Sequence, residues 1–530
     1  MRYLPVARRF IPGAAVALFI ITFLTTRSSF SLRGPLVWTS TSETASACQI
    51  WPGWEASDSG RLSYDACHKA TTSPLIGDVG VLGDPNRCLL ASSRLDQYYS
   101  SPDRNWSEVR WGQAQRQCAA REYKLSPLES SVDQIWRLPE ASQKAEPPLE
   151  GNKGRVAVVL RTWDNYEYTE KRLAWLRALI AEVSLQRAGN YQVFFLVNVK
   201  DPDIHLEEDD AAYEQALIKF VPEEFRDMAV LFNERTLKAW YPLVEEHGAQ
   251  DQMYQALQIF SYKFKQYDFI WQLEMDLRFT SHVHETLESA ATFSRAQSRR
   301  NLWERNGRFY IPDLHNNSYE KFSAAVEAEI GDRGIWGPVS TSEFTSQGRQ
   351  PPSRTKWNWG VGEDADLISF MPMIDPVGTN WVYEDVIKGF ADGIHTPRRV
   401  AIVSITRSSR RLLQLVHEAQ QDRGQWLVSE ATLETFALLH GLKAVTVPHP
   451  IFFDKEMTAE ALDAEINKGP PQSKAGGMTP SMLYSKDGWV PGPWWGASYW
   501  FTGSGAENAW KAYIEGRRLP PMLLHPVKEK

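Results

Sequence analysis

The segment 268–278, DFIWQLEMDLR, contains the residues best suited to chemistry. A short apolar run there ends in Glu274 and Asp276, two carboxylates separated by one residue. Carboxylate oxygens suit Mn²⁺ or Mg²⁺, and such an ion would neutralise a diphosphate leaving group. The pattern predicts a metal site that contains Glu274 and Asp276. The alternative is that both carboxylates only end the strand and cap the next turn.

A second candidate constellation is WNWGVGEDADLI at 357–368. Its two glycines permit a tight bend, and Trp357 and Trp359 offer flat apolar faces on which a sugar ring could stack. An acceptor hydroxyl needs a general base within hydrogen-bond reach, and Glu363 and Asp364 stand beside the tryptophans. We predict Asp364 as the base, although both acids could also cap and begin a helix.

The elements that would position these residues alternate between strands and helices. Apolar runs predict strands at 155–161, 191–199, 228–232, 269–273, 400–405 and 444–447, with amphipathic helices from Thr169 and before the acidic pair. This alternation predicts an α/β fold with a mainly parallel sheet flanked by helices, in which ligands bind at the carboxyl ends of strands. Arg161 and Glu274 fall at such ends. The first strand lacks the glycine-rich turn of a dinucleotide-binding domain.

Composition and the N-terminus indicate a secretory-pathway protein that does not bind nucleic acid. The net charge is -7, and no basic stripe with interleaved aromatics is evident. Arginines precede an apolar run at 10–26, which predicts a signal anchor with the following chain in the lumen; a cleaved signal peptide is the alternative. We therefore predict a single-pass type II protein of the Golgi or endoplasmic reticulum membrane. The predicted parts are a cytosolic tail at 1–9, the anchor at 10–26, a stem at 27–153, a catalytic domain at 154–455 and a C-terminal extension at 456–530.

The cysteines agree with a luminal location. All four lie in the predicted stem, at Cys48, Cys67, Cys88 and Cys118. Four cysteines in an oxidising compartment predict two disulfides, for which three pairings are possible. A zinc site is disfavoured because no close C-x-x-C pair is present.

Three landmarks together resemble glycosyltransferases of the GT-A type. RTWDNYE at 161–167 resembles the first strand and nucleotide-contacting turn, LEMDL at 273–277 resembles the metal motif, and WNWGVGED is similar to a motif of the beta-1,4-galactosyltransferases. Glu274 replaces the first aspartate of the usual metal motif, and Val361 separates the two glycines. The resemblance implies a donor contact at Arg161, a metal ligand at Asp276, acceptor contacts at Trp359 and Glu363, and a base at Asp364. We also predict Thr162 and Asp164 as donor-binding residues, Glu274 as a metal ligand, Trp357 as an acceptor-binding residue, and Glu363 as a catalytic residue beside Asp364.

The same resemblance implies a histidine from the C-terminal part of the domain as a further metal ligand. The segment LLHGLKAVTVPHPIFFD offers His440 and His449. We predict His449, because it lies between two prolines just after the predicted strand at 444–447. A histidine that is only hydrogen-bonded near a strand end is the alternative.

A longer resemblance covers 154–454 and is to the fungal family known as domain of unknown function 3405. It rests on ordered stretches such as LWERNGRFYIP, WGVGEDADLI and LLHGLKAVTVPHPIFFD. The site residues predict a metal-dependent glycosyltransferase with a nucleotide-diphosphate sugar donor and a glycan or glycoconjugate acceptor. The alternative is a non-catalytic luminal glycan-binding or scaffolding protein.

Overall fold

The structure is a computed structural model that describes most of the chain after residue 47. The predicted anchor at 10–26 lies outside the described residues, and no helix within the described ranges is both long and apolar enough to cross a bilayer. Residues 46–530 form one compact unit. The described ranges are 48–51, 54–55, 62–67, 75–102, 104–123, 155–187, 190–335, 337–339, 341–343, 358–379, 381–402, 404–467 and 494–529.

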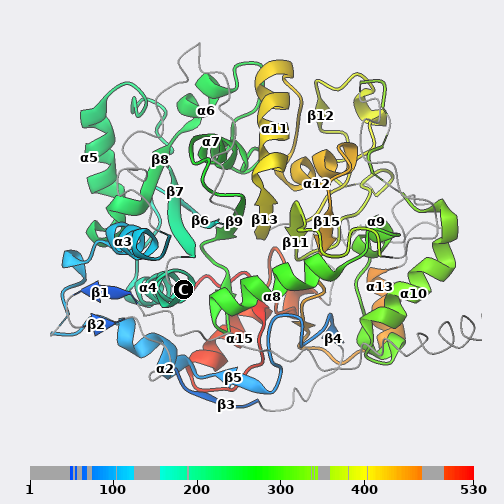
Figure 1. The fold of residues 1–530 in the computed structure, drawn as a ribbon, viewed down its shortest axis with the longest axis horizontal. Helices are drawn as coiled ribbons and strands as arrows, with labels where there is room; N and C mark the ends of the chain where they lie inside the picture. Colours follow the sequence, from blue (N-terminus) through cyan, green and yellow to red (C-terminus); the bar gives the residue numbers. More distant parts are fainter. Residues whose placement is uncertain are drawn as a thin grey trace, which may run out of the picture. The chain divides into compact units, whose positions relative to one another are not determined.

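A seven-stranded sheet forms the centre of this unit, in the order β15-β11-β13-β9-β6-β7-β8 (Figure 1). Only β13 runs antiparallel to its neighbours among these strands. The predicted α/β fold with a mostly parallel, helix-flanked sheet is therefore confirmed. The strands are β6 (Val156–Trp163), β7 (Tyr191–Asn198), β8 (Ala229–Phe232), β9 (Phe269–Glu274), β11 (Leu367–Ser369), β13 (Ile405–Ser409) and β15 (Ala444–Thr446).

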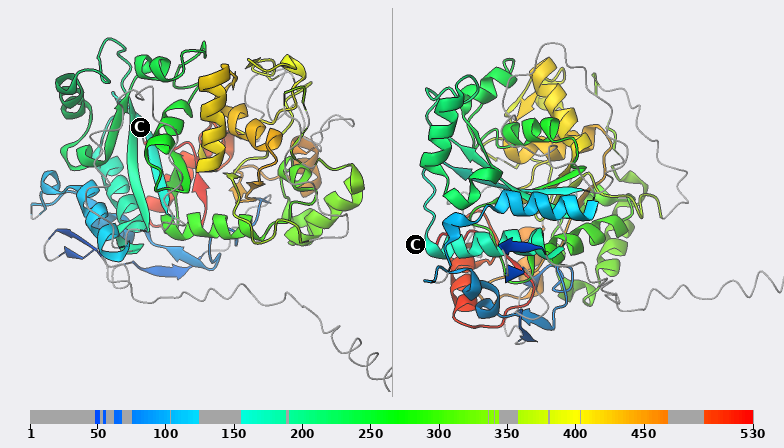
Figure 2. Two further views of the ribbon diagram at one scale, coloured as in Figure 1. Left: turned by 45° about the horizontal axis from the view of Figure 1, so that its top comes forward. Right: turned by 60° about the vertical axis from the view of Figure 1, so that its left-hand side comes forward.

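The strands are continuous apolar runs because both faces of the sheet are covered. In β7, for example, every residue except the last is buried. Figures 1 and 2 show helices on either side of the sheet, α7 (Gln255–Lys263), α11 (Arg410–Arg423) and α12 (Ser429–Leu439) on one face and α3 (Trp111–Tyr123), α4 (Glu170–Val183) and α8 (Val283–Ala296) on the other.

Shorter elements surround these layers. The remaining helices are α2 (Ala91–Leu95), α5 (Asp210–Phe220), α6 (Glu234–Trp240), α9 (Leu302–Asn306), α10 (Tyr319–Ile330), α13 (Ala459–Ile466) and α15 (Gly505–Ile514). The remaining strands pair in twos: β1 (Gln49–Trp51) with β2 (Trp54–Glu55), β3 (Tyr64–Ala66) with β5 (Arg87–Leu89), β4 (Leu75–Ile76) with β16 (Ile451–Phe452), β10 (Arg278–Phe279) with β17 (Leu523–Leu524), and β12 (Ile387–Lys388) with β14 (Trp426–Leu427).

Two predicted elements differ from the structure. The strand expected at 400–405 begins only at Ile405, because Val400 instead exchanges backbone hydrogen bonds with Ile374. The helix considered after Glu363 and Asp364 does not form. These residues follow a turn at 358–362 and lead into the short strand β11, which was not predicted from the sequence.

The cysteine-containing region packs on the sheet domain. Disulfides join Cys48 to Cys118 and Cys67 to Cys88, which selects one of the three possible pairings. Side chains such as Trp111 belong to the same buried core as the sheet. The described residues between 48 and 123, which belong to the predicted stem, are therefore part of the folded unit. The C-terminal helix α15 lies beside α2 from this region (Figure 2).

A buried ion pair links this region to the layer beneath the sheet. Arg94 is fully buried and donates to both oxygens of Glu182, at 2.5 and 2.9 Å. Glu182 also accepts a hydrogen bond from the backbone of Val283 at the start of α8. The pair therefore joins α2, α4 and α8 at one point.

We expect Glu182→Gln to lower the free energy of unfolding by about 3–5 kcal/mol, because it leaves the Arg94 guanidinium buried without its counter-ion. Guanidinium-induced unfolding measures the change. The matched control is Glu285→Gln, which breaks a half-exposed ion pair with Arg187 and should cost about 0–1 kcal/mol. Equal effects of the two substitutions would contradict the assignment.

Candidate metal centre

The candidate centre lies at the carboxyl ends of β6 and β9, where the direction of strand addition changes. β7 and β8 extend the sheet on one side of β6, and β9 pairs with its other side. In such sheets the loops on either side of this switch point diverge and leave a crevice. Arg161 at the end of β6 and Glu274 at the end of β9 are register partners across it.

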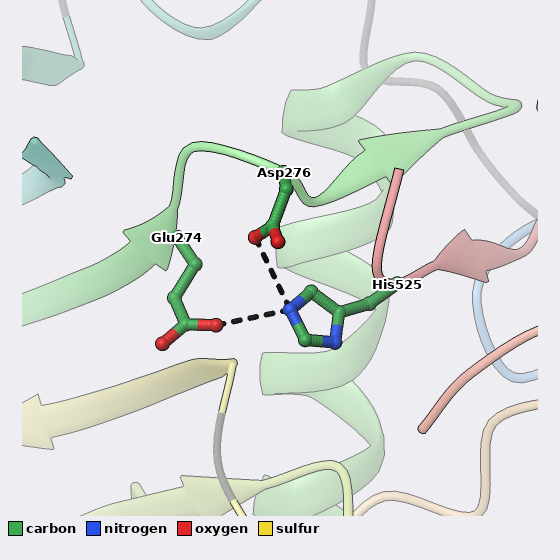
Figure 3. Close-up of side chains that lie close together, drawn as sticks. All are labelled: Glu274, Asp276 and His525. Atoms are coloured by element: carbon green, nitrogen blue, oxygen red, sulfur yellow. Dashed lines mark ion pairs between the residues drawn. The ribbon is translucent and has the colours of Figure 1, made fainter. Parts of the chain in front are cut away.

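Three side chains converge at this point (Figure 3). Glu274 ends β9, and Asp276 follows in the next turn. Nε2 of His525 lies 3.0 Å from Oε2 of Glu274 and 3.2 Å from Oδ1 of Asp276. One possible ligand atom from each residue lies within 4.8 Å of those of the other two. The sequence predicted the two carboxylates, and the structure adds His525.

Strand pairing near the C-terminus puts His525 in place. Antiparallel pairing of β10 with β17 sets Leu524 opposite Arg278, so the next residue, His525, lies near the turn that carries Asp276. The backbone N–H of Val527 donates to the carbonyl of Asp276 at 2.8 Å. His525 also pairs with Tyr499 in a parallel bridge. These contacts hold the imidazole from both sides.

The chemistry of the three side chains fits a divalent metal. Nε2 of His525 is buried and faces the carboxylates of both Glu274 and Asp276. Nδ1 contacts the carbonyl of Trp500, as is usual for metal-binding histidines. Two carboxylates and one imidazole suit Mn²⁺, and with added water also Mg²⁺.

Cations balance the two carboxylates without a metal. Burial opposes the ionisation of Glu274, but Arg161 and His525 outweigh it and lower the pKa of this carboxyl. Burial also opposes the ionisation of Asp276, yet His525 and Lys528 hold its pKa well below the ordinary range. Burial alone would lower the pKa of His525, but the two carboxylates raise it to about 10. A metal bound through Nε2 of His525 would therefore displace a proton from the imidazole.

A cavity of about 520 Å³ opens over this edge of the sheet. It is large enough for a ligand of nucleotide-sugar size. Trp163, at its rim, and Phe501 are partly exposed aromatic residues. The lining residues are Arg161, Thr162, Trp163, Asn198, Lys200, Phe232, Ala249, Gln250, Gln252, Met253, Glu274, Met275, Asp276, Ile402, Glu430, Phe501, His525 and Lys528.

The predicted donor residues lie at or next to this cavity. Arg161 and Thr162 line it, and Arg161 forms an ion pair with Glu274. Asp164 lies just beyond them and is not among the lining residues. Its carboxylate accepts a hydrogen bond from the backbone of Lys200 at 2.8 Å, so it fixes the loop after β7.

The predicted base and acceptor residues lie elsewhere. β11 is parallel to β15 and antiparallel to β13, so Glu363 and Asp364, which precede it, lie at the amino end of the parallel strands. Asp364 is 3.9 Å from Arg407, whose guanidinium stacks over Phe269 at the start of β9. Five residues of strand, roughly 17 Å, separate Phe269 from Glu274. The structure therefore does not bring Asp364 and Glu274 together.

The loop at 358–364 is instead tied to the sheet by charged groups. Nζ of Lys443 donates to the carbonyls of Gly360 and Glu363, at 2.6 and 2.9 Å. Burial lowers the pKa of Lys443 to about 8. Arg299 lies over the ring of Trp359 at 5.6 Å and pairs with Glu363. These contacts give the motif a structural role at the amino edge. Trp357 lies outside the described residues.

His449 lies behind the centre and is absent from the group of possible ligands. Its buried ring packs against Tyr499, with the ring centres 4.5 Å apart. The Tyr499 ring in turn lies 5.9 Å from that of His525. The sequence signal for His525 was an apolar run, Met522–Leu524, that ends in a potential ligand as the run before Glu274 does. The sequence alone does not show that this run pairs with β10, about 245 positions earlier in the chain.

Comparison with protein families places the chain. A family model described as "Protein of unknown function (DUF3405)" matches residues 86–529. The chain belongs to this family. The match extends the resemblance seen over 154–454 in both directions, and it includes Cys88, Cys118 and His525. The matched range thus covers all three residues of the candidate metal centre in this chain. No curated protein was found to match the sequence.

We expect the metal-free protein to lose stability as the pH rises from about 6.5 to about 10. The folded-state pKa of His525, about 10, exceeds the unfolded value of 6.5, so its contribution is complete below pH 6.5 and is lost as the proton leaves. The melting temperature in EDTA, measured against pH for wild type and His525→Gln, tests this. Parallel profiles of the two proteins would contradict the charge assignment.

Proposed function

We propose that this protein is a metal-dependent glycosyltransferase that uses a nucleotide-diphosphate sugar donor and a glycan or glycoconjugate acceptor. The observation that carries the proposal is the meeting of Glu274, Asp276 and His525 in a large cavity at the switch point of the sheet. A divalent ion bound there would offset the negative charge that develops on a diphosphate leaving group. Mn²⁺ or Mg²⁺ suits these ligands.

The cationic side chains around the centre support a diphosphate ligand. Arg161 and Lys528 each contact one of the two carboxylates and also line the cavity. Lys200 adds a third positive charge from the loop after β7. A metal ion that pairs with the two carboxylates would release these cationic groups. They would then bind and orient a diphosphate through charge-assisted hydrogen bonds. Trp163 at the rim offers a flat face for a base or sugar.

A second candidate function is favoured by the same ion pairs. Because Arg161, His525 and Lys528 already neutralise Glu274 and Asp276, the cluster could serve only to fix the C-terminus. The protein would then be a non-catalytic glycan-binding or scaffolding protein that ignores metal. For either function we retain the proposal of a type II protein in the Golgi or endoplasmic reticulum membrane, anchored through residues 10–26.

We expect Asp276→Asn to weaken Mn²⁺ binding at least about 10–100-fold, because it removes one charged ligand. Isothermal titration calorimetry of the purified protein measures the affinity. Asp364→Asn is the matched control, since Asp364 forms a half-exposed ion pair with Arg295 at the other edge of the sheet. It should bind Mn²⁺ like wild type.

Two results would contradict the proposal. If wild type binds no Mn²⁺ and none of a panel of nucleotide sugars raises its melting temperature, the scaffolding function is favoured. If the two aspartate variants lose Mn²⁺ affinity equally, the ion binds elsewhere. A ligand at one hundred times its dissociation constant stabilises the folded state by about 2.7 kcal/mol, which a thermal shift detects easily.

A further inference from the structure

The cavity contains one carboxylate that the metal centre does not use. Of the residues that line it, Glu274, Asp276 and Glu430 carry carboxylates. We propose that Glu430 is the general base that takes the proton of the acceptor hydroxyl. This inference rests on the proposed function and replaces Asp364, which lies at the opposite edge of the sheet, as the candidate base.

Glu430 reaches the cavity from the opposite side of β9 to the main chain that carries the cations Arg161 and Lys200. Arg161 and Lys200 come from β6 and the loop after β7, on one side of β9. On the other side β9 pairs with β13, and the chain just before β13 contributes Ile402. The backbone N–H of Ala401 donates to the carbonyl of Glu430, so Glu430 lies on this second side. A donor diphosphate held by the cations would leave the space near Glu430 to the acceptor.

Several hydrogen bonds fix the main chain at Glu430. Its neighbour Ser429 accepts from the backbone N–H of Met253 and donates to the carbonyl of Gln250, both at 2.8 Å. Gln252 donates to the carbonyl of Leu427, also at 2.8 Å. The start of α12 is therefore attached to the loop that forms the cavity wall. A base on so rigid a support can hold one position relative to a bound hydroxyl.

The surroundings of Glu430 suit a base. Its side chain is half-buried and forms no ion pair within the described part of the chain. Burial, Asp251 and Glu274 raise the pKa of this carboxyl above its ordinary value and outweigh the opposing effect of Arg161, so it is a stronger base than an exposed glutamate. Its place in the first turn of α12, an eleven-residue helix, favours the ionised form.

The proposed step is an in-line displacement. As the acceptor oxygen forms a bond to the anomeric carbon, its proton passes to the Glu430 carboxylate. The bond between that carbon and the diphosphate oxygen breaks, and its electron pair leaves with the nucleoside diphosphate. One displacement of this kind inverts the anomeric centre. Water in place of the acceptor would give the free sugar and the same diphosphate.

The test measures nucleoside diphosphate released with Mn²⁺ from UDP-glucose, UDP-galactose, UDP-N-acetylglucosamine and GDP-mannose by the purified full-length protein. We expect Glu430→Gln to lower turnover of the active donor by about 10²–10⁴-fold, the usual contribution of a general base. Its affinities for Mn²⁺ and for UDP or GDP, measured by calorimetry, should match wild type. Asp364→Asn, the matched control, should keep wild-type turnover.

The outcomes separate this inference from the proposed function. Release by wild type with unchanged turnover in Glu430→Gln would overturn Glu430 as the base and leave the transferase in place. Loss of turnover in Asp364→Asn, but not in Glu430→Gln, would return the role to Asp364. If Glu430→Gln also loses Mn²⁺ affinity or melts earlier, its role is structural and the inference fails. No release by wild type from any donor would overturn both proposals.

Discussion

The charge of two neighbouring carboxylates at the end of a buried strand is the constraint on which the candidate site depends. Glu274 and Asp276 leave the sheet within three residues of each other and are only partly open to solvent. Two such anions need positive partners close by, because burial makes an unpaired charge costly. Arg161 supplies a positive charge from the adjacent strand, and His525 and Lys528 supply positive charge from the C-terminal segment. The last residues of the chain are thus required at the centre of the molecule.

This requirement explains why the C-terminal segment packs as it does. β17 pairs with β10 immediately after the acidic turn, and α15 lies beside α2 of the disulfide-linked region. The same region reaches α4 and α8 through the ion pair between Arg94 and Glu182. N-terminal and C-terminal parts of the chain therefore support one edge of the sheet together.

The carboxyl and amino ends of the parallel strands differ in how their charged residues are used. At the carboxyl edge, charged groups face a cavity and have alternative partners. At the amino ends, Glu363 and Asp364 form ion pairs with arginines, and Lys443 donates hydrogen bonds to three backbone carbonyls. The motif at 358–364, whose sequence resembles an acceptor site, thus has a structural role here. Similar residues acquire different roles because a cavity lies at the carboxyl ends, whereas ion pairs and hydrogen bonds fix the loop at the amino ends.

The sequence by itself determined the class of fold and two of the three residues of the candidate metal centre. Apolar runs identified β6, β7, β8, β9 and β15, since strands covered on both faces must be apolar throughout. The spacing of Glu274 and Asp276 at the end of β9 was a local signal, as was Arg161 near the end of β6. Tertiary structure decided that β11 exists, that Asp364 lies far from Glu274, and that His525 rather than His449 completes the group. Those outcomes depend on strand order and on pairing between residues hundreds of positions apart, and such pairing leaves no periodic trace in a single sequence.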